Sequence, residues 1–361
     1  MSSGAGNNPW AWLGLLKWSL SYADGTSNET PSPMSDEDKA FLEKVMKEGI
    51  INEGERMQEI LKQVTETFTK WKTASWTDTE AEETEDALQE LRDIVEQIDY
   101  ARAFASMKGL NFLIGCVQER QAMPPTTRML ALGIMATMAG NNPPIQKELL
   151  ELGAIRTLSE VYFIEEEDEA NDSSEKIRVR LMQALSAMIR SHDLAEQVFC
   201  QTEQAVALIE SGLGLEKDIS VALRQRSLFF LRALVTSDSA DRARVRRFER
   251  SVGYALDTFT TPEQDDHLRA VTLGLLQQLL EQKNSVNVVL DRKNTLVARG
   301  VERVASLRAL TGEEREYASA EVEQWESILV LIARATPDLP GDNAGGTPMM
   351  LPPSDSPTLP Q

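Results

Sequence analysis

Apolar residues recur every three to four positions along most of this chain. The pattern is clear in FLEKVM (41–46), IVEQI (94–98), LMQALSAMI (181–189) and VTLGLLQQLLEQ (271–282). This spacing places the apolar side chains on one face of an α-helix, whereas the alternation typical of strands is missing. The sequence therefore predicts an all-α fold.

Similar pairs of apolar helices recur along the middle of the chain. Met138 aligns with Ile189 at a spacing of 51 residues, Leu185 with Leu231 at 46, and Leu231 with Leu276 at 45. Repeats of this length with two or three helices each are typical of armadillo or HEAT solenoids, in which neighbouring repeats bury a continuous core. We predict an armadillo-like helical repeat solenoid with helical N- and C-terminal caps and disordered tails.

Composition divides the chain further. Gly, Ser, Asn and Pro are frequent in residues 1–33, and Pro and Gly are frequent in residues 336–361, so we expect a flexible N-terminal segment and a disordered Pro-rich tail. Between them we expect armadillo-like repeats over 87–312 and a capping helix over 313–335. The capping helix carries an apolar stripe formed by Ala318, Val322, Trp325, Leu329 and Ile332.

Two acidic runs are interpreted as solvated connections. The run DTEAEETED (78–86) ends an expected helical cap and linker over 34–86, and EEEDEANDSSE (165–175) is expected to be an insertion between repeats. Together they hold thirteen acidic residues, which account for much of the formal net charge of −20. That charge disfavours binding to nucleic acid or to an anionic membrane.

Little in the sequence points to catalysis. His192 and His267 have no Cys, Asp or His partner at ligand spacing, and Cys116 and Cys200 are expected to be buried. No phosphate-binding glycine loop, nucleophile elbow or paired-cysteine metal site is present. We therefore expect a binding protein that is not an enzyme and has no cofactor or metal. We also expect a monomer in the cytosol, with the nucleus as the alternative compartment.

Arginine is concentrated on four helices that would line the concave side of the solenoid, 127–139, 177–190, 221–235 and 268–280. These helices contain eight arginines and no Asp or Glu. Arginine suits protein interfaces that recognise carboxylates, so the pattern favours an acidic protein partner; the alternative is that these arginines are structural. The candidate contact residues are Arg128, Ala131, Arg178, Arg180, Arg224, Arg226 and Arg232. Armadillo receptors for basic nuclear cargo do not fit, because the Trp and Asn array that they use is absent.

Several segments resemble a known family in the same order and spacing. LLKWSLS is similar to a Leu-Leu-x-Trp-Ser stretch of that family, and PMSDEDKAFLEKVM is similar to its Pro-Met-Ser-acidic helix start. ALQELRDIVEQIDYARAFASMKGLNFLIG and NNPPIQKELLELGAI resemble its first repeats. The chain thus resembles the armadillo-type nucleotide-exchange factors of heat-shock protein 70, known as heat-shock-protein-70-binding protein in animals and Fes-type exchange factor in fungi.

This resemblance implies a partner and a mechanism. The solenoid would bind the nucleotide-binding domain of a heat-shock protein 70 and open its ADP site. By position, the small contact residue of the family corresponds to Ala131. The basic residue at the start of the concave helix of the family's fourth repeat corresponds to Arg226.

The apolar stretch WAWLGLLKWSL (10–20) has two interpretations. In the resembling family a flexible N-terminal segment mimics a client in the peptide-binding site of the chaperone, and the residues that would do so here are Leu13, Leu15, Leu16, Trp18 and Leu20. Alternatively, Leu13, Leu16 and Leu20 share a helical face, which would allow the stretch to pack on the protein's own solenoid.

Overall fold

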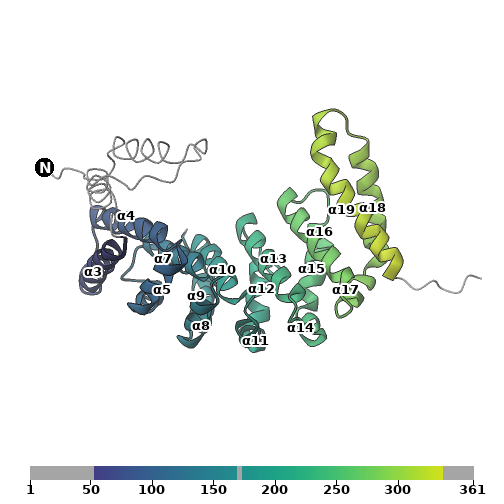
Figure 1. Cartoon of the computed structure of the whole chain (residues 1–361). Helices are drawn as coiled ribbons and strands as arrows, with labels where there is room; N and C mark the ends of the chain where they lie inside the picture. Colours follow the sequence, from purple (N-terminus) through teal and green to yellow (C-terminus); the bar gives the residue numbers. More distant parts are fainter. Residues whose placement is uncertain (1–52, 169–172, 336–361) are drawn as a thin grey trace, which may run out of the picture. The chain divides into compact units, whose positions relative to one another are not determined.

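The computed structural model describes residues 53–168 and 173–335, and all of the regular structure in these two ranges is helical (Figure 1). The predicted client-mimic residues, the residues preceding Glu53 and the Pro-rich tail lie outside the described residues. The chain divides into two compact units, residues 1–234 and 235–361.

From Glu53 onward, the described part of the first unit contains a helix pair followed by helices in groups of three. The pair is α3 (Glu53–Trp71) and α4 (Asp78–Ile94). The groups are α5 (Ile98–Ser106), α6 (Gly109–Gln118) and α7 (Pro125–Ala139); α8 (Pro143–Glu151), α9 (Ala154–Glu167) and α10 (Ser174–Ile189); and α11 (Asp193–Gln201), α12 (Gln204–Leu213) and α13 (Val221–Thr236), the last of which continues two residues into the second unit.

In the first unit, the third helix of one group packs beside the third helix of the next. Helix α7 contacts α4 on one side and α10 on the other, and the side chains of Leu132, Met135, Leu181 and Leu185 are fully buried around these contacts. The side-chain amide of Gln146 links neighbouring repeats. Its Nε2 donates to the carbonyls of residues 187 and 190 (both 2.9 Å) at the C-terminal end of α10, where carbonyls lack a backbone donor from the helix itself.

The second unit repeats the same order of helices. It contains α14 (Arg242–Arg247), α15 (Glu249–Phe259) and α16 (Asp266–Glu281), then α17 (Val286–Leu290), α18 (Lys293–Arg308) and α19 (Glu313–Ala335). Helix α19 has the bounds predicted for the capping helix. Its Trp325, Ile328 and Ile332 are buried, and α18 approaches so closely that a Cβ on Gly300 would lie 2.8 Å from the Trp325 ring.

The expectation that residues 78–86 form a linker is wrong, because they form the first half of α4. Thr77 caps this helix in a capping box: Glu80 N donates to Thr77 Oγ1 (3.3 Å), and Thr77 N donates to Glu80 Oε2 (3.4 Å). The acidic residues that follow lie near the positive end of the helix dipole, where negative charge is stabilising. The acidic run is therefore a helix start.

The insertion expected over 165–175 is also shorter than predicted. Glu165 and Glu166 belong to α9, and Ser174 and Glu175 belong to α10. Glu165 is buried rather than solvated, since Arg128 of α7 and Arg120 of the loop before α7 contact its carboxylate.

Candidate functional surface on the third helices of the first unit

The buried cysteine and the histidine that the sequence singled out have local structural surroundings in the described part of the chain. Among the described residues no group of three His, Cys, Asp or Glu side chains could hold a metal ion, and no helix is long and apolar enough to span a membrane. Cys116 is fully buried, and this burial raises the pKa of its thiol to about 12. His192 Nδ1 accepts from Ala195 N (3.2 Å) and so caps α11.

One of the predicted contact arginines is part of the core of the first unit. Arg128 is 2% exposed; its Nη2 pairs with Glu165 Oε1 (2.8 Å), and its Nε donates to the Val117 carbonyl (3.1 Å) at the end of α6. Arg120 Nε shares the same carboxylate oxygen (2.7 Å), and Ser174 Oγ donates to Oε2 (2.8 Å). Burial alone would raise the pKa of Glu165, but these cations and hydrogen bonds hold it below its ordinary value.

Arg178 is buried in a second network. Its Nη2 lies 2.9 Å from Glu166 Oε1, 3.0 Å from Tyr162 Oη and 2.7 Å from Ser211 Oγ, and its guanidinium stacks over the Tyr162 ring. Residues of α9, α10 and α12 are thereby held together.

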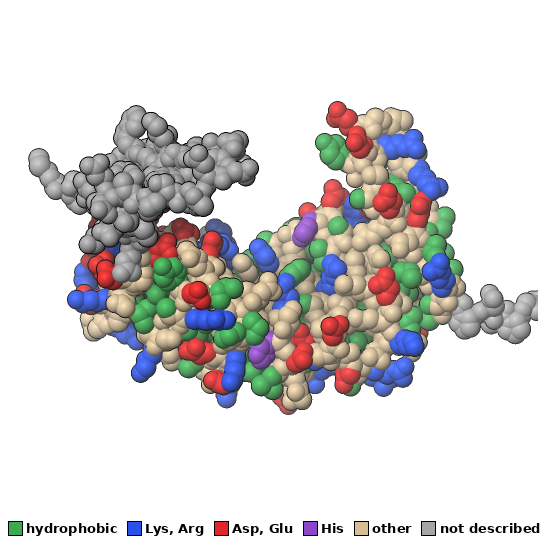
Figure 2. Space-filling view, viewed as in Figure 1, with side chains coloured by type: hydrophobic (Ala, Val, Ile, Leu, Met, Phe, Trp, Pro, Cys, Tyr) green, Lys and Arg blue, Asp and Glu red, His purple; other side chains and the backbone are tan. Residues whose placement is uncertain are grey.

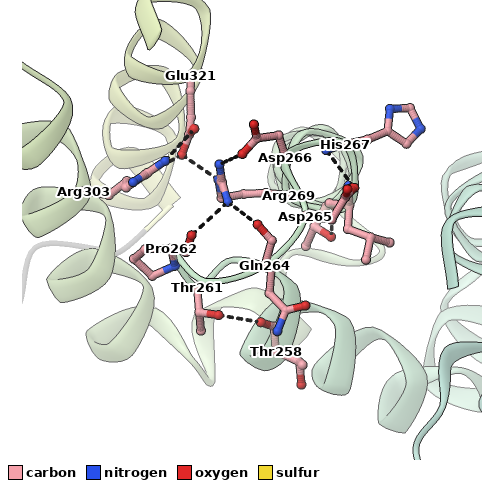
Figure 3. Close-up of polar contacts among 12 residues, drawn as sticks. Thr258, Thr261, Pro262, Gln264, Asp265, Asp266, His267, Arg269, Arg303 and Glu321 are labelled. Atoms are coloured by element: carbon pink, nitrogen blue, oxygen red, sulfur yellow. Dashed lines mark hydrogen bonds and ion pairs between the residues drawn. The ribbon is translucent and has the colours of Figure 1, made fainter. Parts of the chain in front are cut away.

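The second unit also contains a buried arginine that is paired with a carboxylate of another helix. Buried Arg269 donates through Nε to Glu321 Oε1 (2.9 Å) and through Nη1 to the Gln264 carbonyl (2.8 Å), while Arg303 Nε reaches the same Glu321 oxygen (2.8 Å) (Figure 3). Desolvation would raise the pKa of Glu321, but the two arginines lower it. Arg269, on the third helix of its group, thus joins the carbonyl of Gln264 in the preceding loop to the carboxylate of Glu321 on α19.

The count of eight concave arginines therefore overestimated the open positive charge. Arg128, Arg178 and Arg269 are buried and paired with carboxylates, and Ala131 is fully buried. Glu165, Glu166 and Glu321 are partners from other helices, and Asp266, a further partner of Arg269, lies in α16 just before the stretch 268–280. On the face shown in Figure 2, acidic and basic side chains are interspersed over the coloured surface.

A smaller set of arginines carries charge that no carboxylate neutralises. Arg92 on α4, Arg180 on α10 and Arg226 on α13 form no ion pair with any residue of the described ranges. Arg92 Nε donates to Thr137 Oγ1 (3.4 Å), Arg180 Nη1 donates to Gln183 Oε1 (3.0 Å), and Arg226 is exposed. We call these three residues the arginine cluster.

The charges of Arg92 and Arg226 both act on Arg180. The pKa of Arg180 is lowered, first because the side chain is partly desolvated and then because of the charges of Arg92 and Arg226. Holding like charges together is unfavourable unless something compensates. An anionic partner would relieve this repulsion.

A fourth unpaired cation adjoins α13. Arg190 stacks on the ring of Phe229, with Cζ 4.7 Å from the ring centroid, and Phe229 is 40% exposed. Burial lowers the pKa of Arg190, and no carboxylate in the described ranges pairs with it. An exposed aromatic ring stacked on arginine is the type of anchor enriched at protein interfaces.

The remaining predicted residues have partners within the chain. Arg224 Nη2 pairs with Asp218 Oδ1 (2.6 Å), and Arg232 is half-buried and already engaged. Of the predicted contact residues, Arg180 and Arg226 are thus the ones that the structure brings together in the arginine cluster.

Sequence reasoning missed Arg92 and did not count Phe229. Arg92 lies in α4, the helix whose first half was assigned to a linker, although this helix packs beside α7 as α10 does. The exposure of Phe229 had no sequence signal, because it adjoins a second phenylalanine that is buried.

The comparisons with known proteins agree with the resemblance seen in the sequence. The family model described as "Nucleotide exchange factor Fes1" matches residues 13–104. Hsp70-binding protein 1 of mouse is 26% identical, and that of human 25%, over 225 residues, which is 62% of this chain and 59% of each relative. The match therefore spans less than two thirds of these relatives. The resemblance to the armadillo-type exchange factors of heat-shock protein 70 is confirmed.

Solved structures support the fold. A designed armadillo repeat protein is similar with a TM-score of 0.50 and 12% identity over 74% of this chain and 98% of its own. An engineered protein gives a TM-score of 0.53 with 13% identity over 75% of this chain and 96% of its own. The prediction of an all-α, armadillo-like fold is confirmed.

Proposed function

We propose that this protein is a co-chaperone: it binds the nucleotide-binding domain of a heat-shock protein 70 through the arginine cluster and promotes ADP release. The observation that carries the proposal is a set of three arginines, on α4, α10 and α13, that pair with no carboxylate of the described ranges, in a chain of net charge −20, with Arg180 under the charges of the other two. The match to a nucleotide-exchange-factor family and to relatives named for binding Hsp70 supplies the class of partner. We place its action in the cytosol.

The arginine cluster would act by selecting one state of the partner. Paired carboxylates on the chaperone would be bound by the planar guanidinium groups, which match carboxylate geometry. If the chaperone conformation that presents these carboxylates holds ADP weakly, binding by this protein stabilises that conformation and accelerates ADP release. By linkage, nucleotide must weaken the binding of this protein by the same factor. Entry of ATP would therefore release the co-chaperone.

The test is a binding titration with the isolated nucleotide-binding domain, with and without ATP. We expect Arg226→Glu to weaken binding by at least about tenfold, because a charge-reversed residue repels the carboxylates that the cluster attracts. Arg156→Glu is the matched control, since Arg156 is an exposed arginine of α9 that pairs only with Glu160 of the same helix (2.8 Å). Equal binding by wild type and Arg226→Glu would remove the arginine cluster from the interface.

A second candidate function rests on the same observation. The arginine cluster indicates an acidic partner but does not by itself require a chaperone, so a scaffold that holds another acidic protein would use it equally well. Nucleotide separates the two functions, because only the exchange factor predicts that ATP dissolves the complex.

We further propose that residues 10–20 promote client release by occupying the peptide-binding site of the chaperone. The support is their sequence: three tryptophans, four leucines and one lysine, without an acidic residue. Deletion of these residues should leave ADP release unchanged and slow the release of a fluorescent client peptide. Loss of ADP release on deletion would refute this division of roles.

A further inference from the structure

Two arginines in the described part of the first unit stack on an aromatic ring, Arg178 within α10 and Arg190 at the C-terminal end of the same helix. Arg178 Cζ lies 4.8 Å from the centroid of the Tyr162 ring, and Arg190 Cζ lies 4.7 Å from the centroid of the Phe229 ring. The guanidinium group is planar, so it can stack through its face and still donate hydrogen bonds from its edge. A stacked arginine therefore keeps its capacity to bind a carboxylate.

The stack of Arg178 on Tyr162 is completed by a carboxylate of the chain itself. Glu166 follows Tyr162 by four residues on α9, and its Oε1 accepts from Arg178 Nη2 (2.9 Å). Residues four apart on a helix share a face, so α9 presents the ring and the carboxylate together to one guanidinium. Ring, cation and carboxylate are all used within the fold.

The stack of Arg190 on Phe229 has no such carboxylate. The residue four positions after Phe229 on α13 is Ala233, and the guanidinium of Arg190 forms no hydrogen bond or ion pair with the described residues. The Phe229 ring is 40% exposed. The second stack thus leaves open both the ring and the cation edge that the first stack satisfies internally.

An open stack of this kind is unfavourable in the isolated protein. Exposed ring surface loses the stabilisation that burial would provide, and Arg190 is partly desolvated without a counter-ion, which lowers its pKa. The stack also adjoins the arginine cluster, because Arg226 and Phe229 are both exposed and lie three residues apart on α13. A partner that binds the arginine cluster therefore comes close to the stack.

We propose that Arg190 and Phe229 form an anchor for a segment of the protein partner in which a carboxylate residue lies beside an aliphatic one. The carboxylate binds the free edge of the Arg190 guanidinium, as Glu166 binds Arg178, and the aliphatic side chain covers the Phe229 ring. The anchor differs from the arginine cluster because it requires an apolar contact as well as a charge. This inference rests on the proposed function for the identity of the partner.

The first test supplies the missing carboxylate from within the chain. Ala233→Glu places it four residues after the ring, as in the Tyr162 stack, and Ala233→Gln is the uncharged control. Both variants are made with Arg190 and with Arg190→Gln, which separates the coupling of the two positions from other effects of the added charge. At pH 7 and low salt we expect the melting temperature of Ala233→Glu relative to Ala233→Gln to be about 1–4 °C higher with Arg190 than with Arg190→Gln. Zero coupling would overturn the proposal, because a carboxylate beside the ring would then gain nothing from Arg190.

The second test measures binding to the nucleotide-binding domain of a heat-shock protein 70. Phe229→Ala should weaken binding about tenfold or more, as is typical of a central aromatic anchor. Arg190→Lys keeps the charge but loses the planar edge, so it should bind more weakly than wild type, and Arg190→Gln should bind more weakly still. The matched control is Leu194→Ala on α11, which removes a 53% exposed apolar side chain and should bind as wild type does.

The outcomes separate the anchor from the proposed function. If the Phe229 and Arg190 variants bind as wild type does while Arg226→Glu does not, the proposed function stands and the anchor is wrong. If wild type itself does not bind, the proposed function fails, and the coupling between Ala233→Glu and Arg190 still decides whether the stack accepts a carboxylate.

Discussion

Removing the charge of Glu165 tests whether the buried arginines are structural. Glu165→Gln preserves the size of the side chain but leaves Arg128, with a side chain only 3% exposed, without its counter-ion. It also takes away the carboxylate that Arg120 and Ser174 contact. Breaking a buried ion pair by removing one partner costs about 3–5 kcal/mol, because the remaining charge is buried and uncompensated.

The magnitude can be measured by thermal or urea unfolding. For a unit of this size each kcal/mol lowers the melting temperature by about 2–4 °C, so Glu165→Gln should lower it by roughly 6–20 °C. The control is Glu160→Gln in the same helix, whose pair with Arg156 is solvent-exposed and should contribute less than about 0.5 kcal/mol. A change for Glu165→Gln as small as that of the control would refute the assignment of Arg128 to the core.

Three further predictions concern stability and reactivity. Folding lowers the pKa of Glu165 and of Glu321, so their contribution to the free energy of unfolding is complete above the unfolded pKa of about 4.3. That contribution is lost as pH falls through the lowered folded value. Melting temperatures measured across acid pH should show this loss, and Glu165→Gln should reduce it. Gly109→Ala should destabilise by about 1–3 kcal/mol, measured by urea unfolding, because its Cβ would overlap the buried Phe104 ring; wild-type stability would contradict the packing. Cys116 should not react with a thiol reagent at pH 8 until the protein unfolds, and rapid labelling of the native protein would contradict its burial.

The fold was predictable because its signals are local and repeated. The spacing of Met138 and Ile189 and of Leu185 and Leu231 reports the repeat, and these four side chains are buried as that reading requires. The bounds of α19 followed from a single apolar stripe. Acidic residues at 78–86 were misjudged because negative charge is favourable both in solvated loops and at helix starts.

The site was only partly predictable, because sequence shows the charge of a residue but not its partner. Arg128 and Arg226 both lie in the first half of their helices, yet one is buried against Glu165 and the other is exposed. The partner of Arg128 is 37 residues away in sequence. Only the packing of the helices separates an arginine that holds the repeats together from one that is free to bind.

ADP release is the most direct test of the central claim. A fluorescent ADP analogue bound to a heat-shock protein 70 is mixed with excess unlabelled nucleotide and with wild type, Arg226→Glu or Arg156→Glu in a stopped-flow instrument. We predict strong acceleration by wild type and by Arg156→Glu, and loss of that acceleration with Arg226→Glu at unchanged melting temperature. Release at the intrinsic rate with all three proteins would contradict the exchange-factor function, and equal acceleration by all three would contradict its assignment to the arginine cluster.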